Sequence, residues 1–134
     1  MTAPTPRTGF GVRAVRCLTL PLALTTTSAM AGHVDITWDR AGRFERTLML
    51  EPGKFIESCG ELRKGQSIAW SFTADRPVDF SIHYHEGQRL VVPAKHDGAG
   101  DAKGTLAVGV DQVYCWMWTN KSSAEVKLTL ALRR

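Results

Sequence analysis

The sequence predicts an all-β fold, namely a single antiparallel β-sandwich of about eight short strands with one disulfide. Apolar and polar residues alternate with a period of two in most segments after residue 32. Gly, Pro, Asp and Asn separate these segments at a spacing of roughly 8 to 12 residues, which is typical of an all-β domain. No segment has a convincing helical period longer than two turns.

The expected strands follow one another along the chain with short turns between them. Turns are predicted at residues 51–53 (Glu-Pro-Gly) and 75–77 (Asp-Arg-Pro). Residues 57–64 can hold one helical turn, and the polar, Gly-rich segment 94–104 is expected to be a flexible loop between two strands. The predicted strands are 34–39, 46–50, 67–74, 78–85, 89–93, 105–110, 112–119 and 124–132.

The last two segments differ in how they are expected to pack. Segment 124–132 has polar residues on one face, and its apolar face carries Val126, Leu128, Leu130 and Leu132. We therefore expect a strand that is packed on one side only. Segment 112–119 has large or apolar residues on both faces, with Tyr114, Trp116 and Trp118 on one face and Cys115 and Met117 on the other. It is predicted to be a central strand, or a strand with one face covered.

Residues 1–31 have the organisation of a secretory signal peptide. The first 16 residues contain three arginines and no acid, a short apolar run follows, and Ala29-Met30-Ala31 places small residues at positions −3 and −1. We expect cleavage after Ala31, which leaves residues 32–134 as one periplasmic or secreted domain. The apolar run is too short to span a bilayer, and no later segment has the roughly 20 apolar residues of a membrane span.

Removal of the signal peptide changes the charge and the cysteine count. The whole chain has a net charge of +4, but residues 32–134 retain 14 basic and 13 acidic residues without a basic stripe. We therefore expect no nucleic-acid partner. Two cysteines remain, Cys59 and Cys115, and an even count in an exported domain indicates a disulfide, worth about 4 kcal/mol for a loop of about 57 residues. The alternative, a pair of thiolate metal ligands, needs a reducing environment.

Three stretches resemble a known family. They are FIESCGELRKGQSIAWSF, PVDFSIHYHEG and VYCWMWTNKSSAEVKLTLAL. Together they resemble the GOLD domain, which occurs in the emp24-type cargo receptors of the eukaryotic secretory pathway, and the resemblance extends from about Phe44 to Leu132. It implies a compact β-sandwich with Cys59 bridged to Cys115, and a role in binding rather than catalysis. Those receptors continue into a coiled coil, a membrane span and a tail, and we expect this chain to be a stand-alone bacterial version without their role in cargo traffic.

The segment SIHYHEG suggests a metal site. In a strand, His83 and His85 share one face, where two imidazoles can bind one metal ion. The alternative is that both histidines belong to the polar, solvated face of the sheet. Met117 lies between two tryptophans, and a thioether with imidazoles suits Cu(I), although methionine also fills small cores. His96 is a further candidate ligand from the expected loop, where a solvated role is the alternative.

Two further groups bear on the site. Cleavage after Ala31 would give Gly32-His33 at the new N-terminus, where the amine, the first amide and the His33 imidazole can chelate Cu(II). Asp79 and Glu86 are the acids that lie close enough in sequence to orient an imidazole. Catalytic motifs are weak in this sequence, so we do not expect an enzyme.

Two functions follow from these observations. The first is a small periplasmic protein that captures copper, with ligands drawn from His83, His85, Met117, His96 and His33. The second is a metal-free structural or protein-interaction module with a periplasmic protein partner, whose contact surface is a sheet edge or the aromatic strand with Tyr114, Trp116 and Trp118.

Overall fold

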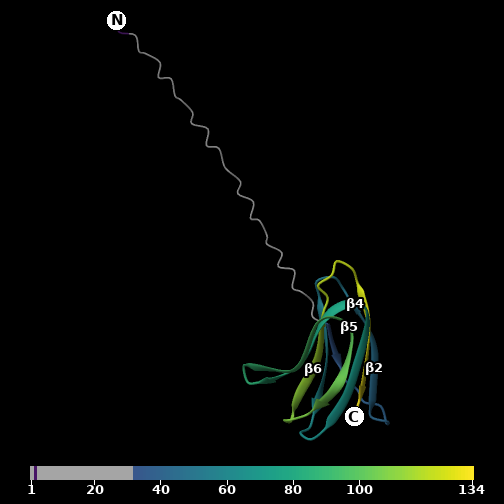
Figure 1. Cartoon of the computed structure of the whole chain (residues 1–134). Helices are drawn as coiled ribbons and strands as arrows, with labels where there is room; N and C mark the ends of the chain where they lie inside the picture. Colours follow the sequence, from purple (N-terminus) through teal and green to yellow (C-terminus); the bar gives the residue numbers. More distant parts are fainter. Residues whose placement is uncertain (1, 3–31) are drawn as a thin grey trace.

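The computed structural model describes residue 2 and residues 32–134, and all of its regular elements are strands (Figure 1). Within these residues the strands are β1 (Gly32–Asp35), β2 (Arg43–Leu50), β3 (Phe55–Leu62), β4 (Ser67–Glu86), β5 (Arg89–Ala107), β6 (Gln112–Thr119) and β7 (Val126–Arg133). They form one sheet in the order β1-β3-β6-β4-β7-β2, and β5 pairs with β4. The all-β prediction is confirmed. The described residues contain no helix that is long and apolar enough to cross a membrane.

The long strand β4 makes the sheet curl around its own core. Residues 69–74 of β4 pair with β7, whereas residues 79–83 pair with β6. The pairing of β4 with β5 shifts register between Thr73 and Val78, at the point where β4 changes neighbour. A bulge bends a strand and increases its twist. The two parts of the sheet can therefore face each other across one core.

Aromatic side chains fill the space inside the bend. Phe72 lies before the bulge and Phe80 after it, and their ring centroids are 4.8 Å apart. Trp118 on β6 contacts both rings, at 5.8 Å from Phe72 and 5.5 Å from Phe80. Trp70 lies 5.0 Å from Phe80. Such pairs add about 0.5–1.5 kcal/mol each beyond the area they bury, so this cluster holds the bend in place.

The prediction that β6 is central is confirmed, because β6 lies between β3 and β4. Its aromatic face is core: Tyr114 is 1% exposed, and Trp116 and Trp118 are 0% exposed. These three side chains are therefore not available as a contact surface for a partner. The packing of β7 also follows the prediction, since its four apolar residues are buried and the residues between them are not.

The expected turn at residues 75–77 is absent, because β4 runs through it from Ser67 to Glu86. Pro77 cannot donate to a ladder, and it lies inside the register shift between Thr73 and Val78. The chain bends there instead of turning back. Two predicted strands are thus one long strand.

The expected loop at residues 94–104 is also wrong, because this segment belongs to β5, which extends from Arg89 to Ala107. Small residues are tolerated there because β4 supplies the packing: a Cβ atom at Gly104 would lie 2.8 Å from Cζ2 of Trp70. Gly98 has a φ of 67° beside one of the irregularities in the β4–β5 pairing. The glycines therefore accommodate a ring and a bulge rather than a free loop.

Two further differences concern β1 and β3. The predicted strand 34–39 overlaps β1 only at residues 34 and 35, because β1 extends from Gly32 to Asp35, and β1 pairs with β3 in parallel rather than antiparallel orientation. Residues 57–64 hold no helical turn, since most of them belong to β3, whose residues pair with β6 from Phe55 to Leu62. The ladder on both sides of β3 satisfies backbone groups that a lone helical turn would leave open.

The predicted disulfide between Cys59 and Cys115 is confirmed. The two cysteines are directly opposite each other on β3 and β6, with their Cα atoms 4.1 Å apart. This separation is that of a non-hydrogen-bonded antiparallel pair. The bridge therefore locks the register of two neighbouring strands.

Candidate functional site

The candidate ligands of β1, β3, β6 and β4 lie in two adjacent rows that cross these four strands. Cross-strand pairing places His33 beside Glu57, Glu57 beside Met117, and Met117 beside Ser81. The next row runs from Asp35 through the two cysteines to His83. Because side chains alternate along each strand, both rows lie on the face opposite the aromatic core.

Glu57 is the centre of this face. One of its carboxylate oxygens, Oε1, lies 3.5 Å from Nδ1 of His33. The other, Oε2, lies 3.8 Å from Nε2 of His83. The carboxylate thus connects an imidazole of β1 with an imidazole of β4, and the disulfide lies in the row beside it. Sequence reasoning missed Glu57, because its proximity to His83 depends on the strand order.

His83 is buried to an unusual degree for a residue on an outer face. It is 6% exposed, and its Nδ1 atom has no hydrogen-bond partner among the described residues. Burial lowers the pKa of His83, the negative charge of Glu57 opposes this shift, and the nearby His85 adds to it. His83 is therefore a neutral imidazole at pH 7, with a nitrogen lone pair free to bind a metal ion.

The two histidines of SIHYHEG lie next to each other, as their spacing predicts. Their ring centroids are 5.6 Å apart and the rings are perpendicular. His85 is exposed, unlike His83. Met117 is half-buried and lies in the row of Glu57. These positions are compatible with a shared ligand, and the copper hypothesis stays a prediction.

His96 lies apart from this cluster. It belongs to β5, where it pairs with Phe80, and its ring is stacked 6.1 Å from Phe80 and lies 6.0 Å from Trp70. Phe80 belongs to the core face of the sheet, opposite to His83. His96 therefore packs against the aromatic cluster and does not reach the other candidate ligands without a rearrangement of β5.

His33 is exposed and bound to carboxylates at both nitrogens. Its Nε2 atom lies 3.0 Å from Oδ1 of Asp35, and this contact is the main reason why the pKa of His33 is raised. A Gly32-His33 chelate depends on cleavage after Ala31, and that site lies outside the described residues.

The two acids expected to orient an imidazole are engaged elsewhere. Asp79 accepts a hydrogen bond of 2.9 Å from the backbone N–H of Gly98 and forms an ion pair with Lys121. Glu86 forms an ion pair with Arg89 across the turn between β4 and β5. Both carboxylates therefore stabilise β-turn or bulge geometry, and Glu57 takes the position beside the histidines.

A second feature of the structure is an arm made by the ends of β4 and β5, residues 84–92. The pairing of β4 with β6 ends at His83, but its pairing with β5 continues to Glu86 and Arg89. The ribbon closes in a two-residue turn at Gly87, whose φ of 61° suits glycine. Figure 1 shows the arm projecting sideways from the body, to the left of the labels β5 and β6.

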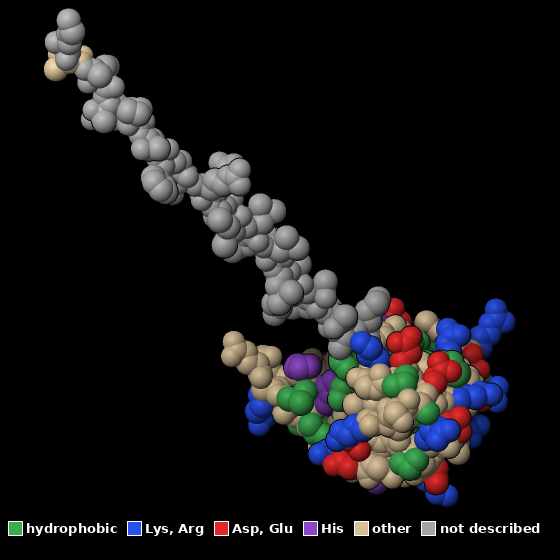
Figure 2. Space-filling model, turned by 90° about the horizontal axis from the view of Figure 1, so that it is seen from above, with side chains coloured by type: hydrophobic (Ala, Val, Ile, Leu, Met, Phe, Trp, Pro, Cys, Tyr) green, Lys and Arg blue, Asp and Glu red, His purple; other side chains and the backbone are tan. Residues whose placement is uncertain are grey.

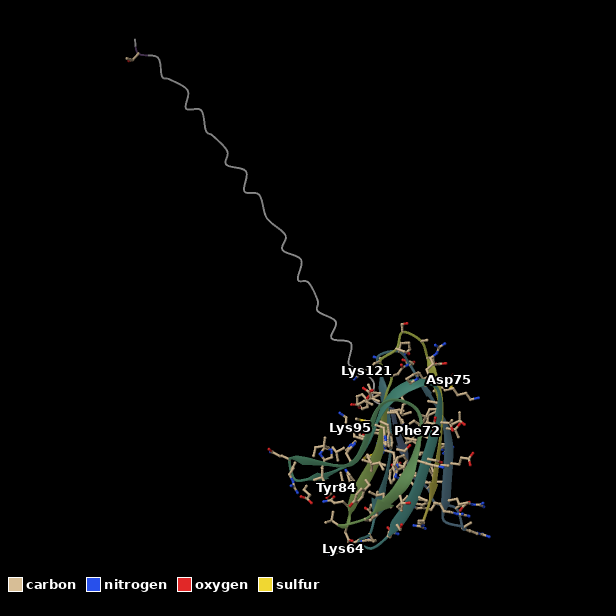
Figure 3. All side chains as sticks on the ribbon, in the orientation of Figure 1. Lys64, Phe72, Asp75, Tyr84, Lys95 and Lys121 are labelled. Carbon is tan, nitrogen blue, oxygen red and sulfur yellow. A yellow bond between two sulfur atoms is a disulfide. The ribbon has the colours of Figure 1, made fainter. Side chains whose placement is uncertain are left out.

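The arm presents apolar side chains to solvent. Leu90 is 53% exposed and Val92 is 42% exposed, and Val113 on the neighbouring β6 is 45% exposed. At the base of the arm, the ring of Tyr84 packs 4.7 Å from that of Tyr114, which anchors the ribbon to the body (Figure 3). Figure 2 shows histidine side chains beside hydrophobic ones where the arm joins the body. The arm is thus a supported, partly apolar projection.

Comparison with known proteins gives a fold similarity. No family model and no curated protein matches the chain, so the resemblance to the GOLD domain stays a prediction. Among solved structures, the chain is similar to PliG from Aeromonas hydrophila, a periplasmic inhibitor of g-type lysozyme, with a TM-score of 0.60 and 14% identity over 77% of this chain and 96% of that chain.

Two further solved structures share the fold at similar distance. PliG from Salmonella Typhimurium, another periplasmic inhibitor of g-type lysozyme, has a TM-score of 0.53 and 10% identity over 76% of this chain and 97% of that chain. The pre-peptidase C-terminal domain of a Bacillus anthracis collagenase has a TM-score of 0.55 and 11% identity over 79% of this chain and 97% of that chain. The fold therefore also occurs in periplasmic inhibitors of g-type lysozyme and in a pre-peptidase C-terminal domain.

Proposed function

We propose that residues 32–134 form an exported, non-catalytic protein of the periplasm that works by binding a protein partner through the β4–β5 arm. The observation that carries this proposal is the projection of the arm with Leu90 and Val92 exposed at 53% and 42%. Apolar side chains on a supported projection can fill a cleft of a partner, and such central anchors contribute most of the binding energy of an interface.

The fold similarity suggests which partner to test first. Two solved structures of similar fold are described as periplasmic inhibitors of g-type lysozyme. An enzyme of that class has a cleft for a polysaccharide, and a narrow ribbon suits insertion into a cleft. We therefore propose a g-type lysozyme as the partner.

Calorimetric titration of the exported protein against a g-type lysozyme tests this proposal. We expect binding that a Leu90→Asp, Val92→Asp double variant weakens about thirtyfold or more, because a charge would replace each apolar side chain that the complex buries. Met49→Asp is the matched control, since Met49 is 52% exposed but lies on β2, an edge strand that β7 separates from β4. Equal loss in both variants, or no binding by the unaltered protein, would contradict the proposal.

Copper capture is a second candidate, favoured by the perpendicular rings of His83 and His85 at 5.6 Å. Titration of the disulfide-bonded protein with Cu(I) and Cu(II), in competition with a chromophoric chelator, is expected to give one ion per chain. The His83→Ala, His85→Ala double variant should lose this copper binding while its fold remains intact. Unchanged copper affinity in that variant would exclude these two ligands.

A further inference from the structure

We propose that Cys59, Cys115, His83 and Glu57 bind one zinc ion when the disulfide is reduced. The ion and the sulfur–sulfur bond would then be alternative occupants of one site on the outer face of the sheet. This site shares His83 with the ligand set considered for copper, but its other donors are two thiolates and a carboxylate, and it does not depend on a protein partner.

The geometry brings the four donors together from three adjacent strands. Cys59 and Glu57 share one face of β3, Cys115 is opposite Cys59 on β6, and His83 is opposite Cys115 on β4. Ligand atoms of Glu57, His83 and Cys115 all lie within 4.8 Å of one another. Ligand atoms of Glu57, Cys59 and the more exposed His33 are equally close. Tetrahedral zinc with bonds of about 2.0 to 2.3 Å needs only small shifts from such an arrangement.

The burial of the donors supports a ligand role rather than chance proximity. Cys59 and Cys115 are 5% and 8% exposed, and His83 is 6% exposed. The Nδ1 atom of His83 has no hydrogen-bond partner within the described part of the chain, although a buried polar atom usually has one. Its other nitrogen faces the Glu57 carboxylate at 3.8 Å. A metal ion bound to Nε2 of His83 would also meet the Glu57 carboxylate, and Nδ1 would carry the proton of the neutral imidazole.

The chemistry of the exchange balances with a dithiol as reductant. The dithiol transfers two electrons and two protons to the Cys59–Cys115 bond, which breaks, and the reductant becomes a cyclic disulfide. Zinc then displaces the two thiol protons and is bound by two thiolates, the neutral imidazole of His83 and the Glu57 carboxylate. A newly exported chain arrives with its cysteines as thiols, so the metal-bound form would precede the disulfide.

The test is a zinc titration of the exported protein after reduction, in competition with a chromophoric chelator. We expect one zinc ion per reduced chain and at least about a hundredfold weaker binding by the oxidised protein, because the oxidised sulfurs are not thiolate ligands. When Co(II) is used in place of zinc, the reduced protein should show thiolate-to-cobalt charge-transfer absorption. His83→Ala and Glu57→Gln should each weaken binding about tenfold or more.

His96→Ala is the matched control, because His96 packs on the aromatic cluster and away from the cysteines. Tryptophan fluorescence of each reduced variant shows whether the core is intact. Zinc affinity that is unchanged by both His83→Ala and Glu57→Gln would indicate chelation by two thiols alone and would overturn the proposal. Failure of the reduced protein to bind one zinc ion would overturn it as well.

Discussion

At the scale of single residues, burial decides which histidine differs from ordinary surface histidines. His83 and His85 are two residues apart on the same face of β4, but their surroundings differ. His83 is enclosed by Glu57, Cys115 and the strand β5, whereas His85 lies at the start of the arm. Alternation predicts that they share a face. It does not predict that one of them is 6% exposed, because enclosure depends on neighbouring strands that the local sequence does not specify.

The buried His83 predicts a loss of stability in mild acid. Its pKa is lowered in the folded protein by burial, so below a pH of about 6.5 the unfolded chain binds more protons than the folded chain. The free energy of unfolding should therefore fall between pH 7 and pH 5, with a slope of at most about 1.4 kcal/mol per pH unit from this residue. Urea denaturation at the two pH values measures it.

A His83→Leu variant isolates this effect. This variant should lose less stability between pH 7 and pH 5 than the unaltered protein, because it lacks the imidazole that binds a proton more readily in the unfolded chain than in the folded one. His33 acts in the opposite direction, since its raised pKa gives stability that is lost as pH rises, and it is present in both proteins. An identical loss in the two proteins would exclude His83 as the cause.

Asn120 is a second residue whose burial sets a clear expectation. Its Nδ2 donates to the backbone oxygens of Leu50 and Ala124 at 3.0 and 2.7 Å, and its Oδ1 accepts from the N–H and hydroxyl of Ser122 at 2.9 and 2.7 Å. Asn120→Ala should lower the free energy of unfolding by about 3 kcal/mol, because it leaves these groups unpaired in a buried place. Ser122→Ala, which removes one hydroxyl, should cost about 1 kcal/mol. Equal effects in denaturant titrations would contradict this account.

At the scale of elements, the sequence predicts well those strands whose own residues have a clear pattern of apolar side chains. Apolar residues alternate with others along β7, and β6 has large or apolar residues on both faces, so the one-sided packing of β7 and the central position of β6 follow from the pattern. Segment 94–104 has few residues that favour strands, and it is a strand because β4 pairs with it. The position of Glu57 beside His83 likewise depends on strand pairing, because β6 lies between β3 and β4.

Gly104 tests whether β5 depends on the packing of β4. A methyl group at this position would lie 2.8 Å from the Trp70 ring, which is buried and cannot move away easily. Gly104→Ala should therefore lower the free energy of unfolding by about 1–3 kcal/mol through overpacking. Gly109→Ala is the matched control, since no atom lies within 4 Å of a Cβ there, and it should change stability by less than about 0.5 kcal/mol.

At the scale of the whole molecule, the features divide between a rigid body and a projecting arm. In the body, the aromatic cluster and the continuous sheet restrict the position of β4, and the Cys59–Cys115 bridge joins β3 to its neighbour β6. The arm begins where β4 leaves β6, so its direction is set by the body while its tip remains accessible. A rigid scaffold that presents a short ribbon is suited to binding a preformed cleft without a large entropic cost.

Binding of a protein partner by the arm is tested most directly by the activity of a g-type lysozyme in the presence of increasing amounts of the exported protein. We expect inhibition that saturates at one exported protein per lysozyme and is lost in the Leu90→Asp, Val92→Asp variant but kept in Met49→Asp. Full lysozyme activity at a large excess of the unaltered protein would contradict it.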